Sequence, residues 1–245
     1  MNKNCSVVVL TCDSYSDLWE PFFILKNRYW DDCPYETYLI TETKKCKYSK
    51  TINVDEKIWT KKVREGLNKI KSDYVIILLE DFFIRDKVDN ERIQYCMNQF
   101  DKNTAMFNFE KSYDENDIES EIEGFKIKTE KSLYKCSCQA AIWDRKKLIE
   151  LLAKDWDPWT WETSEPIKKY KFYINSAEVI FDYGYENHEW FGLCKGKWIK
   201  KDVVPLFKKE NIKIDFKKRG FYKKDSFIKK VLKKIRKLYN NYENK

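Results

Sequence analysis

Residues 74–83 have the sequence Tyr-Val-Ile-Ile-Leu-Leu-Glu-Asp-Phe-Phe, in which a nearly continuous apolar run ends at two adjacent acids, Glu80 and Asp81. A run of this length is typical of a strand that is buried on both faces of a parallel sheet. In open α/β sheets, ligands bind beyond the carboxyl ends of such strands. Carboxylates at that position suit a divalent cation that also binds phosphate oxygens. The alternative is that the two acids only begin a solvated turn.

Strand and helix patterns alternate around this run. Residues 6–12 and 36–41 are predicted to be further buried strands, and a polar, Lys-rich connection follows the second of them. Helical apolar spacing is present in residues 15–30, 55–71 and 88–100. This alternation predicts an α/β fold with a Rossmann-like, mixed but mainly parallel sheet flanked by helices.

The pattern after residue 104 is less regular. An acidic insertion, residues 112–123, separates two short predicted strands and is expected to be a solvated loop or hairpin. The other elements predicted in this part are strands at 105–109, 124–128, 134–143 and 178–183, and helices at 146–153 and 202–211.

The composition is that of a folded, enzyme-like protein. Aromatic residues make up 16% of the 245 residues, whereas there are only 6 Gly and 5 Pro. The N-terminal sequence lacks a signal-peptide pattern, and no apolar run approaches the length of a transmembrane helix. We therefore expect a cytoplasmic protein whose eight Cys are reduced thiols.

Positive charge is concentrated near the C-terminus. Residues 195–245 contain 19 Lys and Arg against 5 Asp and Glu, although the net charge of the whole chain is only +8. Residues 223–245 have the pattern of a basic amphipathic helix, which favours binding to an anionic membrane surface. The alternatives are a terminal helix docked on its own domain and a module that binds nucleic acid, although we expect no nucleic acid partner.

Four segments, taken in order, resemble the GT-A glycosyltransferases, specifically those of bacterial capsule and lipopolysaccharide (surface polysaccharide) biosynthesis. The resemblance spans residues 5–222 and depends on the order and spacing of the segments. They are Val7-Val-Val-Leu-Thr-Cys-Asp-Ser-Tyr15, residues 74–83, Gln139-Ala-Ala-Ile-Trp143 with Asp157-Pro-Trp-Thr-Trp-Glu162, and Lys195-Gly-Lys-Trp198.

The resemblance implies a GT-A domain over residues 1–222, with a nucleotide-binding half at about 1–103 and an acceptor half at about 104–222, followed by the basic helix. It also implies which residues bind the donor. Thr11, Asp13 and Glu42 would contact the base and ribose, and Asp81, with Glu80 beside it, would hold Mn²⁺ or Mg²⁺ against the diphosphate. The family's usual Asp-x-Asp motif is not matched, because Phe83 stands where its second acid would be.

For catalysis, the resemblance points to Glu162 as the general base of an inverting transfer. Asp157 and Glu165 are neighbouring alternatives. Trp159 and Trp161 would form a flat surface against a sugar and raise the pKa of Glu162 by excluding water.

Four further residues are candidates for the site. Gln139 and Trp143 would line a sugar pocket, although Trp143 is equally compatible with the core. Lys195 and Lys197 would stabilise the leaving diphosphate across Gly196. His188, the only histidine, is either structural or a further metal ligand.

Together these features predict an enzyme that transfers a sugar from a nucleotide-sugar donor, a UDP-sugar, to a hydroxyl group of a lipid-linked surface glycan. The enzyme would be peripheral on the inner face of the cell membrane. Two alternatives remain at this point. One is a nucleotidyltransferase, and the other is a non-enzymatic module that binds anionic membranes or nucleic acid.

Overall fold

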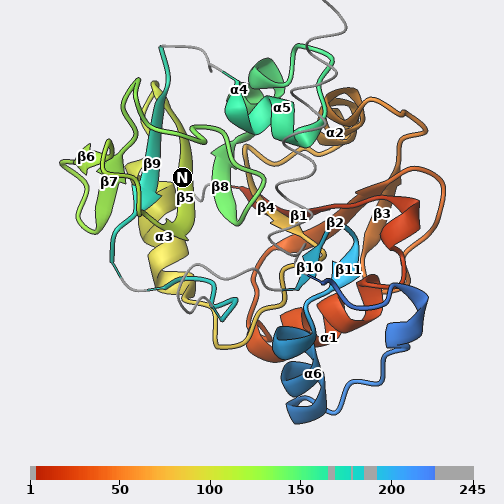
Figure 1. The fold of residues 1–245 in the computed structure, drawn as a ribbon. Helices are drawn as coiled ribbons and strands as arrows, with labels where there is room; N and C mark the ends of the chain where they lie inside the picture. Colours follow the sequence, from red (N-terminus) through yellow and green to blue (C-terminus); the bar gives the residue numbers. More distant parts are fainter. Residues whose placement is uncertain (1–3, 165–168, 178, 185–191, 224–245) are drawn as a thin grey trace, which may run out of the picture. The chain divides into compact units, whose positions relative to one another are not determined.

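A computed structural model of the chain describes residues 4–164, 169–177, 179–184 and 192–223 (Figure 1). The chain divides into two compact units, residues 1–189 and residues 190–245. The basic helix predicted for residues 223–245 lies outside the described residues, apart from Lys223.

The described part of the first unit contains a nine-stranded sheet with the order β3-β2-β1-β4-β8-β5-β9-β7-β6. β1 to β4 are mutually parallel, and β5 is parallel to β9, whereas β8 is antiparallel to both β4 and β5. The predicted mixed, mainly parallel α/β fold is therefore confirmed. The strands are β1 (Cys5–Leu10), β2 (Glu36–Thr41), β3 (Lys50–Asn53), β4 (Tyr74–Leu79), β5 (Thr104–Lys111), β6 (Ile118–Glu119), β7 (Phe125–Ile127), β8 (Ala141–Asp144) and β9 (Lys171–Asn175).

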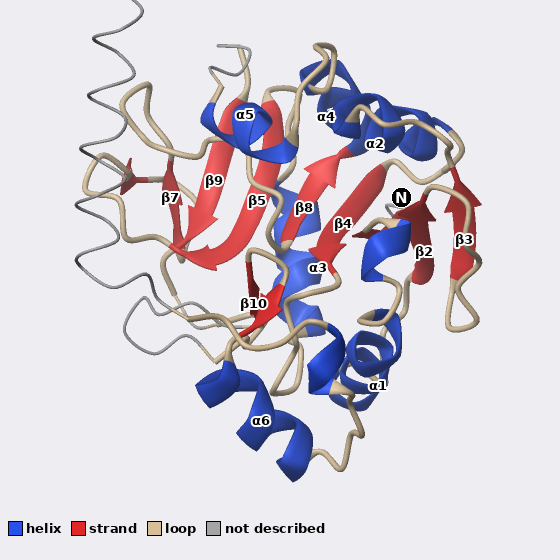
Figure 2. Ribbon diagram, turned by 45° about the vertical axis from the view of Figure 1, so that its right-hand side comes forward, coloured by secondary structure: helices blue, strands red, loops and turns tan. Residues whose placement is uncertain are grey.

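Helices cover both faces of this sheet, and α2, α4 and α5 lie together on the face opposite α1 and α3 (Figure 2). The placement of α1 and α2 on opposite faces follows from right-handed crossovers, because α1 leads from β1 toward one edge and α2 leads from β3 back past β1. The helices are α1 (Trp19–Tyr29), α2 (Trp59–Asn68), α3 (Asn90–Gln99), α4 (Arg145–Leu151) and α5 (Pro158–Thr163), with a short 3-10 turn, η1 (Asp13–Tyr15).

The central strand β4 is buried on both faces, as its sequence predicted. Val75 and Ile77 belong to the core beneath α2, α4 and α5, and Ile76 and Leu78 are equally inaccessible on the other face. Burial of a side chain of this size contributes about 1.5–3 kcal/mol, so β4 anchors the acids that follow it.

Several predicted strands are wrong. The strand predicted for 134–143 is confined to Ala141–Asp144, and Tyr134 instead has a left-handed backbone, with φ 50°. The described residues of 178–183 form no strand, whereas β9, which was not predicted, pairs with β5.

The Lys-rich connection after β2 contains the short edge strand β3. The acidic insertion does form a hairpin, in which β6 pairs with β7.

The described part of the second unit contains the hairpin β10 (Leu193–Cys194) and β11 (Lys197–Trp198), the helix α6 (Lys200–Lys209) and the 3-10 turn η2 (Phe216–Lys218). Its core is formed around Trp198, which is 1% exposed and packs edge-on against Phe207 and Phe216, with ring centroids 5.7 Å away in each case.

Candidate active site

Three parallel strands end side by side at one edge of the first unit's sheet. β1 lies between β2 and β4, with Leu10 beside Ile40 on one side and Leu79 on the other. The chain leaves β1 toward β2 and later returns on the opposite side of β1 as β4, which makes this edge a topological switch point. Five of the predicted site residues lie within three residues of the ends of these strands: Thr11, Asp13, Glu42, Glu80 and Asp81.

A buried lysine that the sequence did not single out joins three of these residues. Lys62, on α2, is 6% exposed; its ammonium group donates a hydrogen bond to the backbone oxygen of Thr11 (2.9 Å) and forms an ion pair with Glu42. Glu42 also accepts a hydrogen bond from the backbone N–H of Asp13. Burial is the largest single influence on Glu42 and opposes its ionisation, but the hydrogen bonds from Lys62 and the backbone, together with the charge of Lys62, lower its pKa. Lys62 thus fixes the ends of β1 and β2 relative to each other.

The carboxylate of Asp13 shapes the loop after β2. It accepts hydrogen bonds from the hydroxyl of Thr41 (2.8 Å) and from the backbone N–H groups of Thr43 and Lys44 (each 3.1 Å to the nearer oxygen). Burial opposes ionisation, but these hydrogen bonds, together with one from the Thr43 hydroxyl, lower the pKa of Asp13 to about 2. Asp13 is therefore ionised at neutral pH and orders the backbone beside the switch point.

The two acids that follow β4 have different environments. Glu80 is 5% exposed, and burial, followed by the negative charge of Asp81, raises its pKa well above the usual range. Thr11 and the charge of Lys62 act in the opposite direction with smaller effects. Asp81 is only half-buried. Glu80 therefore favours its neutral form, and Asp81 is the more accessible carboxylate.

This difference decides which acid suits a metal ion. Mg²⁺ and Mn²⁺ are often bound by one or two carboxylates, with phosphate oxygens and water completing the coordination. Within the described residues, no group of three or more His, Cys, Asp or Glu side chains is arranged to hold a metal ion. Asp81 could serve as a single protein ligand of such a cation, whereas Glu80 would first have to lose its proton and become accessible.

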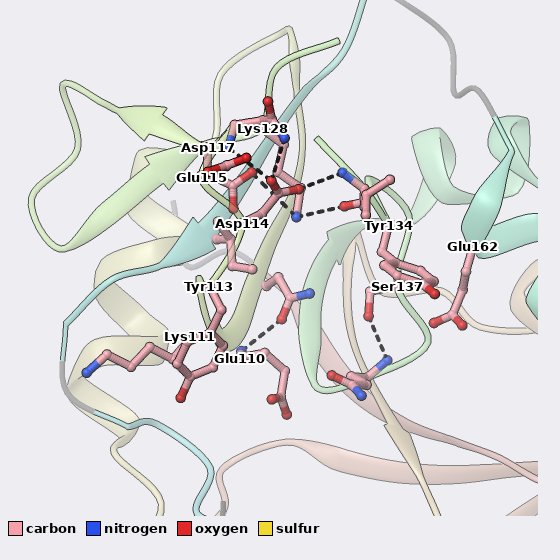
Figure 3. Close-up of a pocket in the computed structure, with 15 residues that line it drawn as sticks. Glu110, Lys111, Tyr113, Asp114, Glu115, Asp117, Lys128, Tyr134, Ser137 and Glu162 are labelled. Atoms are coloured by element: carbon pink, nitrogen blue, oxygen red, sulfur yellow. Dashed lines mark hydrogen bonds and ion pairs between the residues drawn. The ribbon is translucent and has the colours of Figure 1, made fainter. Parts of the chain in front are cut away.

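A large polar pocket, of about 680 Å³, opens in the first unit (Figure 3). Its walls come from the end of β5, from the acidic insertion, from the loop before β8, and from α5. Two predicted site residues, Gln139 and Glu162, line it. The complete lining is Asn108, Glu110, Lys111, Tyr113, Asp114, Glu115, Asn116, Asp117, Lys128, Leu133, Tyr134, Ser137, Gln139, Glu162 and Ile174.

Glu162 has the environment that a general base needs. It is half-buried near the end of α5, and its Oε1 accepts a hydrogen bond from the backbone N–H of Cys138 (2.7 Å). Burial raises the pKa of Glu162, and the hydrogen bonds from Cys138 offset only part of this effect. A carboxylate with a raised pKa is a stronger base at neutral pH.

Cys138 connects the pocket with the end of β4. Burial raises the pKa of the Cys138 thiol well above its usual value, and the negative charges of both Glu162 and Asp81 contribute to the increase. Cys138 is hydrogen-bonded to Glu162, and because β8 runs antiparallel to β4 with Ala141 opposite Ile77, the residues before β8 lie beside the end of β4, which Asp81 follows. The structure thus brings these two residues into one region.

The alternatives to Glu162 differ in their surroundings. Asp157 is the N-cap of α5 and accepts hydrogen bonds from the backbone N–H (3.0 Å) and the hydroxyl (2.7 Å) of Thr160, which lower its pKa. Asp157 therefore stabilises the helix that carries Glu162. Glu165 lies outside the described residues.

The aromatic residues near Glu162 require two corrections. Trp161 is 2% exposed and donates a hydrogen bond to the backbone oxygen of Leu151 (3.1 Å), so it cannot face a sugar. Trp143 is inaccessible and packs against Trp161, with ring centroids 5.9 Å apart, so it belongs to the core and does not line the pocket. Trp161 is the residue through which α5 packs on the core, and Trp143 lies beneath it, whereas Trp159 is 75% exposed.

Lys195 and Lys197 belong to the second unit. Lys195 and Gly196 form the turn of the β10–β11 hairpin, with φ values of 52° and 71°, as a two-residue type I′ turn requires. Lys197 is exposed on β11. Their contact with a diphosphate stays a prediction. His188 lies outside the described residues.

Two parts of this region were not predicted from the sequence. Lys62 lies within the helix predicted for residues 55–71 but was not named as a site residue, and only the fold places it at the strand ends. The loop 113–117 was predicted to be solvated, but it forms one wall of the pocket. The one signal of this role in the sequence was the concentration of acids directly after β5. β5 runs parallel to β9 and ends beside this loop.

Comparison with known proteins gives similarity in structure only. No protein-family model matches the sequence, and no curated protein matches it. CMP:2-keto-3-deoxy-manno-octonic acid synthetase, complexed with CTP, is similar with a TM-score of 0.46 and 12% identity over 85% of this chain and 97% of that chain. The galactosyltransferase LgtC, in complex with donor and acceptor sugar analogs, is similar with a TM-score of 0.40 and 11% identity over 59% of each chain.

The bifunctional IspDF from Campylobacter jejuni is also similar, with a TM-score of 0.36 and 13% identity over 64% of this chain. This chain spans 46% of the length of IspDF and 59% of the length of LgtC. Because all three TM-scores are below 0.5, these similarities do not indicate which reaction the protein catalyses.

Proposed function

We propose that the protein is a glycosyltransferase that transfers a sugar from a nucleotide-sugar donor, a UDP-sugar, to a hydroxyl group of a glycan. The observation that carries this proposal is Glu162, a carboxyl group with a raised pKa on the wall of a pocket of about 680 Å³, which is hydrogen-bonded to the loop before β8, the strand that runs beside β4. Pockets of roughly 300–1,000 Å³ are typical of small-molecule sites.

The proposed reaction is a single displacement. The acceptor oxygen forms a bond to the anomeric carbon while the bond from that carbon to the diphosphate oxygen breaks, and the acceptor proton moves to Glu162. One displacement inverts the configuration at the anomeric carbon. A divalent cation, when bound, would be held by Asp81 and would supply positive charge to the leaving diphosphate.

Nucleotide binding and product analysis test this proposal. UDP with Mn²⁺ should raise the melting temperature, because a ligand that binds only the folded state stabilises it. The protein should then release UDP from a UDP-sugar when an acceptor is present. Release of pyrophosphate from CTP or UTP with a sugar substrate would instead identify a nucleotidyltransferase and overturn the proposal.

We further propose that the acceptor is lipid-linked and that the protein binds the inner face of the cell membrane through residues 223–245. The support is the sequence of this segment, which combines an apolar stripe with many Lys residues. Among the described residues, no helix has both the length and the apolar character needed to cross a membrane.

Removal of residues 226–245 is expected to abolish sedimentation with vesicles that contain an anionic lipid, while UDP binding remains. Each basic residue near such a surface contributes about 1 kcal/mol, so the loss should be large at low salt and small at high salt. Vesicles of neutral lipid are the control. A truncated protein that melts much lower or becomes insoluble would show that the segment is part of the folded core.

A further inference from the structure

We propose that the acceptor is an uncharged oligosaccharide of at least two sugar rings, which lies across two adjoining hollows on either side of Glu162 and is held by Tyr134. This inference rests on the proposed function, and it specifies the acceptor class that the site selects.

The first observation is that Glu162 lines two hollows. The pocket of about 680 Å³ and a smaller hollow of about 140 Å³ share Leu133, Tyr134 and Glu162. The smaller hollow continues along α5 to Thr163 and Ser164. A substrate that presents its hydroxyl to Glu162 therefore has room to extend past this residue, as an oligosaccharide does and a monosaccharide does not.

The second observation is where exposed apolar side chains gather. Tyr113, Leu133 and Tyr134 are 61%, 66% and 55% exposed, and all three line the larger pocket. Trp159 is 75% exposed and lies three residues before Glu162 on α5, although it lines neither hollow. Exposed apolar groups that cluster in this way mark binding surfaces. Flat aromatic rings with a polar edge suit the C–H faces and hydroxyl rims of sugar rings.

The third observation is the backbone of Tyr134. Its φ of 50° is uncommon for a residue other than Gly, and such strain is found where a function requires it. The preceding residue is held on both sides, because the N–H of Leu133 donates to Asp114 (2.7 Å) and its carbonyl accepts from the ammonium group of Lys128 (3.1 Å). The loop thus fixes Tyr134 with its side chain directed toward Glu162 (Figure 3).

The fourth observation is the charge of the pocket. Five carboxyl groups and two ammonium groups line it. One ammonium group, that of Lys128, is buried and lies 3.7 Å from Asp117, so its charge is offset within the wall. The remaining excess of negative charge repels an acidic sugar or a phosphate. A neutral, hydroxyl-rich glycan avoids this repulsion and can donate hydrogen bonds to the carboxylates.

Binding of defined saccharides in the presence of UDP tests the inference. The probes are α- and β-linked neutral disaccharides, including cellobiose, lactose and N,N′-diacetylchitobiose, together with their monosaccharides and digalacturonic acid. NMR titration should show at least one neutral disaccharide binding about tenfold or more tightly than its monosaccharides and than digalacturonic acid. Equal binding of monosaccharides, preference for digalacturonic acid, or no binding of any neutral disaccharide would overturn the inference.

Matched variants locate the effect. Tyr134→Ala should weaken disaccharide binding by about tenfold, and Tyr134→Phe should restore it. Ile118→Ala, at an equally exposed site outside both hollows, should have no effect. Glu115→Lys should improve binding of digalacturonic acid, whereas Glu123→Lys, an exposed acid outside the pocket, should not. Equal effects of Tyr134→Ala and Ile118→Ala on disaccharide binding would contradict the inference. Equal effects of Glu115→Lys and Glu123→Lys on binding of digalacturonic acid would also contradict it.

A separate measurement distinguishes failure of the inference from failure of the proposed function. Hydrolysis or transfer of a UDP-sugar reports the donor chemistry independently of acceptor length. If UDP-sugar is consumed without any preference for neutral disaccharides, the acceptor class is wrong and the proposed function stands. If no UDP-sugar is consumed and UDP does not bind, the proposed function itself is wrong.

Discussion

Replacement of Glu162 by Gln is expected to lower the kcat of sugar transfer by about 100-fold or more while nucleotide binding stays unchanged. The amide keeps the size of the side chain and can still accept the hydrogen bond from the N–H of Cys138, but it cannot take up the acceptor proton. General-base catalysis typically contributes roughly 10²–10⁴-fold. Single-turnover rates with a UDP-sugar, together with UDP affinity measured by calorimetry, provide the readout.

The controls for this experiment are the two neighbouring acids. Asp157→Asn should retain most of the activity, because Asn is also a good N-cap and Asp157 serves as one. Glu165→Gln tests the remaining acid of this segment. If the Glu162 variant transfers sugar at a normal rate and the Glu165 variant does not, the general base is Glu165. Normal transfer by all three variants would place the base outside this segment.

The raised pKa of Glu162 also predicts a pH dependence of stability. The folded protein binds the proton of Glu162 more tightly than the unfolded chain, so this group reduces the free energy of unfolding as pH rises through its folded pKa. Glu162→Gln removes this cost. The variant should therefore be more stable than the wild type at neutral pH, and the difference should disappear below about pH 4, where the acid is protonated in both states. Urea unfolding at several pH values measures this difference, and equal stability at neutral pH would contradict it.

The fold was predicted best where one short segment determines its own environment. The apolar run of β4 is long enough to indicate burial on both faces, whatever pairs with it. β9 could not be recognised in this way, because its pairing with β5 and β7 joins residues far apart in sequence. A strand was predicted for residues 178–183, but Phe181 and Tyr183 are buried by ring contacts with Trp30, Phe109 and Phe82 without a strand ladder.

The candidate site was predicted in part for a similar reason. The position of the acids after β1, β2 and β4 follows from the rule that parallel strands end at the same edge of a sheet. The direction of an aromatic side chain does not follow from sequence. Trp143 faces the core because its register opposite Val75 places both residues beneath α4 and α5. Lys62 is directed inward because its ammonium group forms an ion pair with Glu42 and donates a hydrogen bond to the backbone oxygen of Thr11. Both of these residues are distant from Lys62 in sequence.

Replacement of Asp81 by Asn is expected to remove most of the metal-dependent part of UDP binding. Asp81 is the accessible carboxylate at the switch point, and an amide oxygen without charge is a weak ligand for Mg²⁺ or Mn²⁺. Loss of a residue that only supports a metal ligand already costs roughly 10–100-fold in affinity, so loss of the ligand itself should cost on the order of 100-fold. Calorimetric titration of UDP with and without Mn²⁺ separates the metal-dependent part from the rest.

Glu80→Gln is the matched control for this prediction, because the two acids are adjacent but differ in burial. The carboxyl group of Glu80 is 5% exposed and favours its neutral form, which Gln imitates in shape and charge. The Glu80 variant should therefore bind UDP with nearly the same dependence on Mn²⁺ as the wild type. It should also be at least as stable at neutral pH, because the buried Glu80 carboxyl group must take up a proton on folding, whereas the amide is uncharged in both states. If Glu80→Gln loses the metal dependence and Asp81→Asn keeps it, the ligand is the buried acid, and the end of β4 must rearrange when the cation binds.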